Sequence, residues 1–260
     1  MQISDYLDDI ARAAGFLSRL PMPARHFAGH DGSLSRASGM FPVAGLMIAL
    51  IPGLTMLILS MLGANSALTA IIVLIVLIGV TGALHEDGLA DSADGFGARG
   101  GRDHMLEIMK DSRTGSYGVL ALVASFALRA TALTIILSVA GGWNAALMLL
   151  AVAAVSRAAM VWHWSELPPA RQQGVAASVG APEDSARTLA LALGAGIFLA
   201  LAGLACGLIP AALALAAVAL ASSRWTSAVR SKLNGHTGDT IGACEQIAAT
   251  AGLVTLALLL

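Results

Sequence analysis

Long apolar stretches alternate with short polar ones along the chain, and this pattern predicts a bundle of membrane-spanning helices. A helix needs about 20 apolar residues to cross a bilayer, and stretches of about this length recur along the chain. The predicted spans are residues 40–62, 66–84, 117–140, 143–162, 188–206, 209–222 and 243–260. We therefore expect an all-α fold, a polytopic membrane helix bundle of about seven transmembrane helices that forms one integral membrane domain over residues 1–260.

The composition excludes an ordinary soluble domain. Apolar residues make up 57% of the chain and charged residues only 12%, whereas soluble proteins carry roughly 25% charged residues. The formal net charge is −1, which gives no indication of nucleic acid as a partner. The two cysteines lie far apart and have no metal-binding or disulfide spacing.

The charged residues predict how the bundle is oriented. Every Lys and Arg except Arg129 and Arg157 falls in residues 1–39, 85–116, 163–187 or 223–242, and the three short turns between the other span ends carry no charge. Because cytoplasmic loops of membrane proteins carry an excess of Lys and Arg, these four segments are predicted to lie in the cytoplasm, together with the N-terminus. All sixteen acidic residues lie in or at the edge of the same segments, so we expect an active site on the cytoplasmic side of a multi-pass membrane protein.

The segment after the second span carries a periodic row of carboxylates. Residues 85–95 read HEDGLADSADG, and on a helix Asp87, Asp91 and Asp94 fall within an arc of about 60°. After Gly100 and Gly101, a second acidic row follows with four-residue spacing: Asp103, Glu107 and Asp111. Residues 85–116 are thus the predicted active-site segment.

Such rows of like charge favour a bound cation. Two carboxylates about 6 Å apart repel each other by about 3 kcal/mol at an effective dielectric constant of 20. Oxygen ligands without cysteine fit magnesium, manganese or calcium better than zinc, and magnesium commonly joins carboxylates to substrate phosphates. The alternative is a solvated acidic loop. The candidate metal ligands are Glu86, Asp87, Asp91, Asp94, Glu107 and Asp239, although Asp239 equally fits a cap of the last helix.

Basic residues accompany the acidic segment. Arg99, Lys110 and Arg113 are candidates for binding substrate phosphates, although basic residues at this position also serve as ordinary membrane anchors. Arg129 lies deep in its span and is expected to face the bundle interior. Arg157 lies near the inner end of its helix, from which it can reach the membrane surface, and neither arginine is assigned a site role.

Four motifs together resemble the cobalamin synthase family, the adenosylcobinamide-GDP ribazoletransferases. The motifs are residues 85–95, MKDSR-x-G at 109–115, LP-x-P at 20–23 and TGD at 237–239, and the likeness covers nearly the whole chain. The resemblance implies that adenosylcobinamide-GDP is joined to α-ribazole or its 5′-phosphate, with release of GMP and a requirement for Mg²⁺. A shorter likeness, Asp91-x-x-Asp94-Gly95-x-x-Ala98-Arg99, is similar to the opening of the CDP-alcohol phosphotransferase signature, but the spacing of its second half does not match.

On this interpretation, Asp87, Asp91 and Asp94, with Glu107 or Asp111, hold one or two Mg²⁺ ions across the substrate diphosphate. Asp111 is the first choice for the base that takes the proton from the ribazole hydroxyl, and Asp94 is expected to stabilise the reacting charge. The alternatives are a phospholipid-making enzyme of the CDP-alcohol type and a cation-coupled secondary transporter, whose coupling acids belong near the bilayer midplane. Self-association is left open by the sequence.

Overall fold

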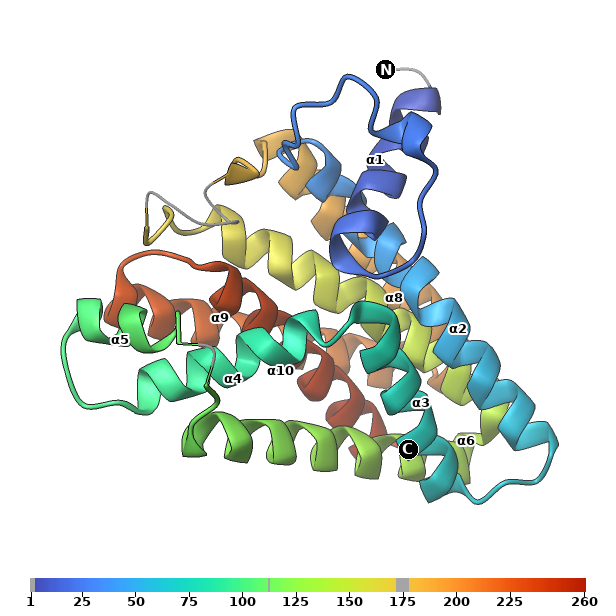
Figure 1. The fold of residues 1–260 in the computed structure, drawn as a ribbon. Coiled ribbons are helices and arrows are strands. Elements are labelled where there is room, and N and C mark those ends of the chain that lie inside the picture. The colour runs from blue at the N-terminus through green and yellow to red at the C-terminus, as the bar shows by residue number, and fades with distance from the viewer. Residues whose placement is uncertain (1–2, 112, 172–177) are drawn as a thin grey trace.

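The apolar stretches fold as helices that pack into one bundle (Figure 1). The computed structural model describes residues 3–111, 113–171 and 178–260, and this part of the chain contains no named strand. The long helices that follow the predicted spans are α2 (Phe41–Met61), α3 (Ser66–Thr81), α6 (Ser116–Ser165), α8 (Asp184–Cys206), α9 (Leu208–Leu233) and α10 (Gly238–Leu258). The other helical elements are α1 (Ile3–Leu17), η1 (Ala24–His26), η2 (Ala37–Met40), α4 (Leu84–Gly97) and α5 (Arg102–Ile108).

The all-α membrane fold is confirmed, but the count of seven spans is not. Within the described residues, five helices are long and apolar enough to cross a bilayer, or six if α3 and α4 form one broken span. One of the five is α6, whose 50 residues would measure about 75 Å as one straight helix, more than the roughly 30 Å hydrocarbon core. Gly141 has a non-helical backbone, with φ 77° and ψ 166°, and divides α6 into two arms at the predicted turn, which Figure 1 shows at a sharp angle to each other.

The junction of α3 and α4 turns the acidic segment away from its span. Gly82 and Ala83 both adopt the left-handed conformation, with φ 65° and 61°, and the two helix axes differ by 91°. Glycine suits position 82 because residues with a Cβ rarely adopt so positive a φ. The predicted second span therefore ends at Thr81 rather than at residue 84, and the carboxylates begin a new helix.

Two predicted spans differ most from the structure in their bounds. The sixth was predicted to end at residue 222, yet α9 continues to Leu233, because Thr226, Val229 and Leu233 still find buried positions. The last span was predicted to start at residue 243, but α10 starts five residues earlier at Gly238. Both differences arise because polar residues extend these helices beyond their apolar parts.

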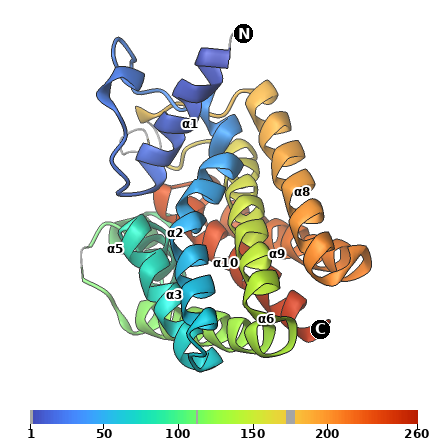
Figure 2. The ribbon, with the colours of Figure 1, turned by 90° about the vertical axis from the view of Figure 1, so that its right-hand side faces the viewer.

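The helix ends separate into two groups, as the charge pattern predicts. The N-terminus, α1 and α5 lie on one side of the bundle, and the uncharged turn between α2 and α3 lies on the opposite side (Figure 1). A view turned by 90° shows α8 beside the second arm of α6 (Figure 2). The chain is therefore a multi-pass membrane protein whose charged segments gather at one end of the bundle.

Candidate active site

The predicted carboxylate row lies on a continuous helix. Residues 84–97 form α4, which packs against α10 and α6. Asp87 is exposed and Asp91 is half-buried, and no hydrogen bond or ion pair involves either carboxylate within residues 3–111, 113–171 and 178–260. The charges of Asp87, Asp239 and Asp94 all act on Asp91, so these four carboxylates lie in one electrostatic neighbourhood.

The close approach of α10 brings Asp239 to this neighbourhood. A Cβ on Gly88 would lie 2.7 Å from the Asp239 carbonyl oxygen, so only glycine permits this packing without a shift. The N-terminus of α10 is capped by a reciprocal pair of hydrogen bonds between Thr237 and Thr240. Asp239 therefore does not serve as the cap, and among the described residues its carboxylate accepts only a 3.2 Å hydrogen bond from the Thr237 hydroxyl.

Asp94 joins the end of α4 to the start of α6. One carboxylate oxygen accepts a hydrogen bond from the Gly115 N–H at 2.6 Å, and the other accepts one from the Gly118 N–H at 2.8 Å. A carboxylate at a helix N-terminus satisfies free N–H groups and interacts favourably with the helix dipole. Asp94 thus anchors α6, whichever other role it has.

The second acidic row forms only in part: Asp103 and Glu107 lie four residues apart on α5, but the prediction that Asp111 continues the stripe is wrong. Helix α5 ends at Ile108, so Asp111 does not share a helix face with Asp103 and Glu107. The Asp111 carboxylate instead accepts a hydrogen bond from the Arg113 N–H at 3.0 Å and pairs with the Arg113 guanidinium at 2.5 Å. Such local bonding competes with helix formation.

The same ion pair joins two candidate site residues, Asp111 as the base and Arg113 as a phosphate-binding cation. The Arg113 guanidinium and backbone N–H lower the pKa of Asp111 to about 2. Glu107 lies on the exposed part of α5 and faces His104 at 3.5 Å. Residue 112, which belongs to the MKDSR motif, lies outside the described residues.

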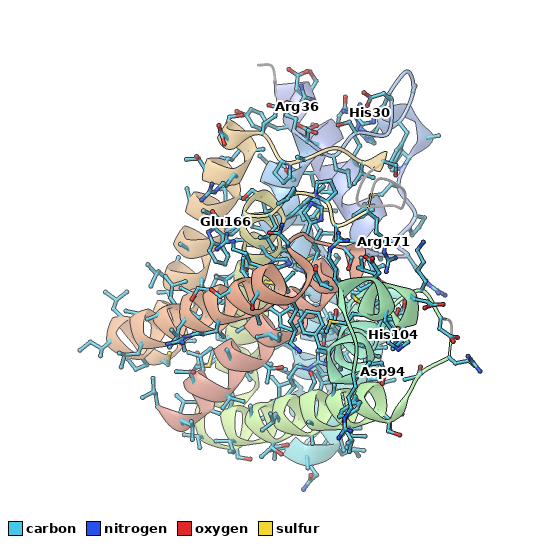
Figure 3. All side chains as sticks on the ribbon, turned by 90° about the vertical axis from the view of Figure 1, so that its left-hand side faces the viewer. His30, Arg36, Asp94, His104, Glu166 and Arg171 are labelled. Atoms are coloured by element: carbon cyan, nitrogen blue, oxygen red, sulfur yellow. The ribbon has the colours of Figure 1, made fainter. Side chains whose placement is uncertain are left out.

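The predicted phosphate-binding cations are exposed residues in the segments that follow α4 and α5 along the chain. Arg99, Lys110 and Arg113 all have exposed side chains. The sequence analysis missed Arg171, which Figure 3 shows on the side where Asp94 and His104 also lie. Its charge interacts with that of Asp239, one guanidinium nitrogen donates to the Leu106 carbonyl oxygen, and its buried Nε atom has no hydrogen-bond partner among the described residues.

Beneath α4, buried charges form a continuous network that the sequence analysis did not predict. Glu86 lies 3.5 Å from Arg129, and Glu245 lies 2.7 Å from Arg157. Gln246 links the two pairs, because its amide nitrogen donates to Glu86 at 3.0 Å and to Glu245 at 2.9 Å.

This network changes two sequence interpretations. Arg157 is only 2% exposed, so it does not extend to the membrane surface but pairs inside the bundle. Arg129 faces the interior as expected. Glu86, a candidate metal ligand, has its carboxylate held by Arg129 and Gln246. The adjacent polar residues Glu245 and Gln246, near the start of the last span, were the signal that an interior partner existed.

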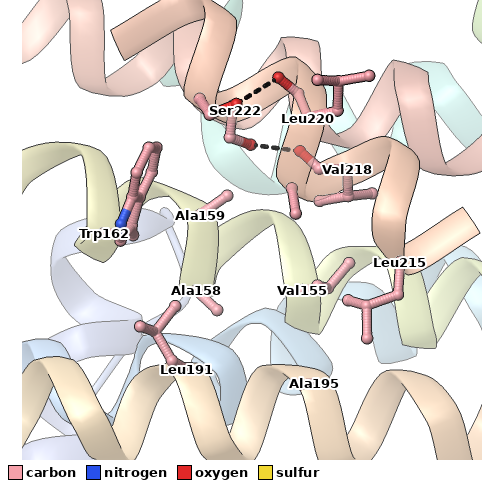
Figure 4. A pocket seen from close by; sticks show the side chains of 12 residues that line it. Val155, Ala158, Ala159, Trp162, Leu191, Ala195, Leu215, Val218, Leu220 and Ser222 are labelled. Atoms are coloured by element: carbon pink, nitrogen blue, oxygen red, sulfur yellow. Dashed lines mark hydrogen bonds between the residues drawn. The ribbon is translucent and has the colours of Figure 1, made fainter. Parts of the chain in front are cut away.

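Two cavities differ in their relation to the carboxylates. One of about 200 Å³ is lined by Asp87 and Asp239 together with aromatic and apolar residues. A larger one of about 540 Å³ lies between α6, α8 and α9 (Figure 4) and has no charged residue in its wall. Of these two, the smaller adjoins the carboxylates, and a further cavity of about 370 Å³ is lined by Glu107, Lys110 and Arg171.

The carboxylates near Asp91 have the chemistry that Mg²⁺ prefers, but their side chains do not yet converge. Asp87, Asp91 and Asp239 offer hard oxygen ligands, which Mg²⁺ prefers, and their mutual repulsion favours a bound cation. In the side-chain positions of residues 3–111, 113–171 and 178–260, no three His, Cys, Asp or Glu residues already converge as a metal site. The chemistry of the donors therefore fits Mg²⁺, and ligation requires these side chains to rotate towards one another.

Comparisons with known proteins agree on one family. The family model described as cobalamin-5-phosphate synthase matches residues 9–257. A relative from Sinorhizobium medicae is 50% identical over 99% of this chain and 98% of its own length, and one from Rhizobium johnstonii is 49% identical over 99% of both chains. A relative from Brucella ovis is 39% identical over the full length of both. All three are named adenosylcobinamide-GDP ribazoletransferase, and no solved structure matches the chain.

Proposed function

The chain belongs to the cobalamin-5-phosphate synthase family, and from this membership we propose how its carboxylates and cations serve the reaction. The reaction joins adenosylcobinamide-GDP to α-ribazole in cobalamin biosynthesis. The sequence prediction of this activity is confirmed, and it takes the place of the alternatives of a phospholipid-making enzyme and a transporter.

We propose that Asp87, Asp91 and Asp239 hold Mg²⁺ during the transfer. The observation that carries this proposal is the packing of α10 on Gly88, which brings Asp239 to the carboxylate face of α4. When bound, Mg²⁺ neutralises negative charge on the substrate diphosphate and on the departing nucleotide. Glu86 has its partners in the buried network and Asp94 anchors α6, so we assign both to holding the ligand-bearing helices in place.

The transfer itself needs one bond made and one broken. The ribazole hydroxyl oxygen attacks the phosphorus that carries the cobinamide, the bond from that phosphorus to GMP breaks, and GMP leaves with the bonding electron pair. Phosphoryl transfer depends mainly on positioning and charge stabilisation. Arg99, Lys110 and Arg113 have exposed side chains in the acidic segment, which suits them to bind the phosphate oxygens.

Asp111 is proposed as the base that accepts the hydroxyl proton. Arg113 covers its carboxylate and keeps its pKa at about 2, which makes it a weak base in the substrate-free protein. A substrate phosphate that draws Arg113 away would release Asp111 and allow its pKa to rise towards the ordinary value near 3.9. Substrate binding and base activation are therefore linked through one ion pair.

We place the reaction at the cytoplasmic surface of the membrane. The support is the gathering of α1, α4, α5 and the start of α10 at the charged end of the bundle, together with the positive-inside distribution of Lys and Arg. A water-soluble nucleotide can reach such a site directly.

The test is GMP release by the purified full chain in lipid vesicles, supplied with adenosylcobinamide-GDP and α-ribazole. We expect activity to disappear with EDTA and to return with added Mg²⁺, and we expect Asp87→Asn to lower kcat by more than about 100-fold. Asp103→Asn is the matched control, because Asp103 is 94% exposed on α5 and has no proposed role. Full activity in EDTA would refute the metal site.

A further inference from the structure

A small cavity opens beside the proposed metal ligands and is walled mainly by aromatic and apolar groups. Asp87 from α4 and Asp239 from α10 lie on its charged side. Phe16 from α1, Phe41 from α2 and Trp164 from α6 form its other walls. Four helices and the α10 start thus converge on about 200 Å³ of space.

The aromatic residues form one continuous wall. The Phe41 ring centroid lies 6.2 Å from that of Phe16 and 6.2 Å from that of Trp164. Phe41 and Trp164 are buried, whereas Phe16 is 36% exposed. Aromatic rings at such distances interact favourably with a further planar ring placed beside them.

Two buried nitrogen atoms belong to residues of this wall and lack partners. His85 Nε2 and Trp164 Nε1 have no hydrogen-bond partner among the described residues, and both side chains are at most 2% exposed. Buried polar atoms are satisfied in the great majority of cases. Both residues line the cavity, so a ligand bound there supplies the missing partner once these side chains turn towards it.

The size and polarity of the cavity indicate which ring system of the two substrates it can bind. Ligand sites for whole drug-sized molecules occupy about 300–1,000 Å³, so this cavity holds one small ring system and excludes a corrinoid macrocycle. Guanine carries donors and acceptors along most of its edges, which these apolar walls cannot satisfy. The base of α-ribazole is a dimethylated bicyclic ring with one free acceptor nitrogen, which matches apolar walls and an N–H donor such as Trp164 Nε1.

We propose that this cavity binds the aromatic base of α-ribazole. The proposal rests on the proposed function, since it places the ribose hydroxyl near Asp87 and Asp239, where the diphosphate is held. Phe16, Phe41 and Trp164 are then specificity-determining residues for the acceptor substrate, and they have no role in binding the GDP-activated corrinoid.

The first experiment measures the KM of each substrate in the full chain. Phe16→Ala removes part of the wall from a half-exposed position, and we expect the KM for α-ribazole to rise about tenfold while the KM for adenosylcobinamide-GDP stays unchanged. Trp164→Phe keeps the ring and removes the N–H donor, so a rise of about three- to tenfold is expected for α-ribazole alone. Tyr6→Ala is the control, because Tyr6 is 37% exposed on the same helix and does not line the cavity. An unchanged KM for α-ribazole, or an equal rise of both KM values, overturns the proposal.

The second experiment measures equilibrium binding of labelled α-ribazole to the full chain in EDTA, without the second substrate. We expect saturable binding that Phe16→Ala weakens about tenfold and Tyr6→Ala leaves unchanged. If this binding is seen but activity needs no Mg²⁺, the metal site fails and the base site stands. If activity needs Mg²⁺ but α-ribazole binding is independent of Phe16, the base site fails and the proposed function stands.

Discussion

Replacing Asp94 with asparagine should destabilise the protein whether or not magnesium is present. The carboxylate accepts hydrogen bonds from the N–H groups of Gly115 and Gly118, and each bond to a charged group contributes about 1.5–3 kcal/mol. Asparagine has a single acceptor oxygen, so one bond becomes neutral and the other is lost. The favourable interaction with the α6 dipole, about 0.3–1 kcal/mol, is lost as well. We expect a decrease of about 3 kcal/mol in the free energy of unfolding, which corresponds to a melting temperature lower by about 6–12 °C.

Thermal unfolding of the purified chain in EDTA and in excess Mg²⁺ measures this effect. In the wild type, a ligand at 100 times its Kd adds about 2.7 kcal/mol of stability. Asp94→Asn should keep that Mg²⁺-dependent increase on a lower baseline, whereas Asp87→Asn should keep the EDTA baseline and lose the increase. The anchoring role of Asp94 is refuted if Asp94→Asn melts like the wild type in EDTA. Loss of the Mg²⁺-dependent increase in Asp94→Asn would instead show that Asp94 is a ligand, as the sequence analysis predicted.

Three further predictions concern packing, buried charge and pH. Gly88→Ala should lower the free energy of unfolding by about 1–3 kcal/mol and reduce activity, because its Cβ would lie 2.7 Å from a backbone oxygen of α10. The control is Gly79→Ala, whose Cβ would have no neighbour within 4 Å and which should melt and turn over like the wild type. Arg157→Met or Glu245→Gln alone should each lower the free energy of unfolding by about 3–5 kcal/mol, because each leaves one buried charge unpaired. In a double-mutant cycle the double variant should lose less than the sum of the two, and additive losses would contradict a direct coupling. Burial lowers the pKa of His236 to about 4, so between pH 6.5 and 4 the unfolded chain binds a proton that the folded chain does not. The free energy of unfolding should therefore fall by about 3 kcal/mol as the pH decreases through this range. In pH-dependent melting, His236→Gln should be less sensitive to acid over that range, and an unchanged pH profile would contradict this.

Local patterns in the sequence predicted the helices and the carboxylate face of α4. The periodicity of Asp87, Asp91 and Asp94 follows directly from the geometry of a single helix, and the apolar stretches follow from the thickness of a bilayer. The same reasoning failed for Asp111, because a four-residue spacing cannot show that Arg113 ends the helix by binding that carboxylate. Periodicity predicts which side chains share a face only while the helix continues.

The sequence by itself determined a multi-pass helical protein with its charges at one end and its acids on one helix, because each of these properties depends on neighbouring residues. The tertiary structure alone decided how those acids divide their roles. Gln246 meets Glu86 across 160 residues of chain, and α10 meets α4 at Gly88. Contacts between distant segments depend on how whole helices pack, and the packing of one helix against another is not contained in the periodicity of either.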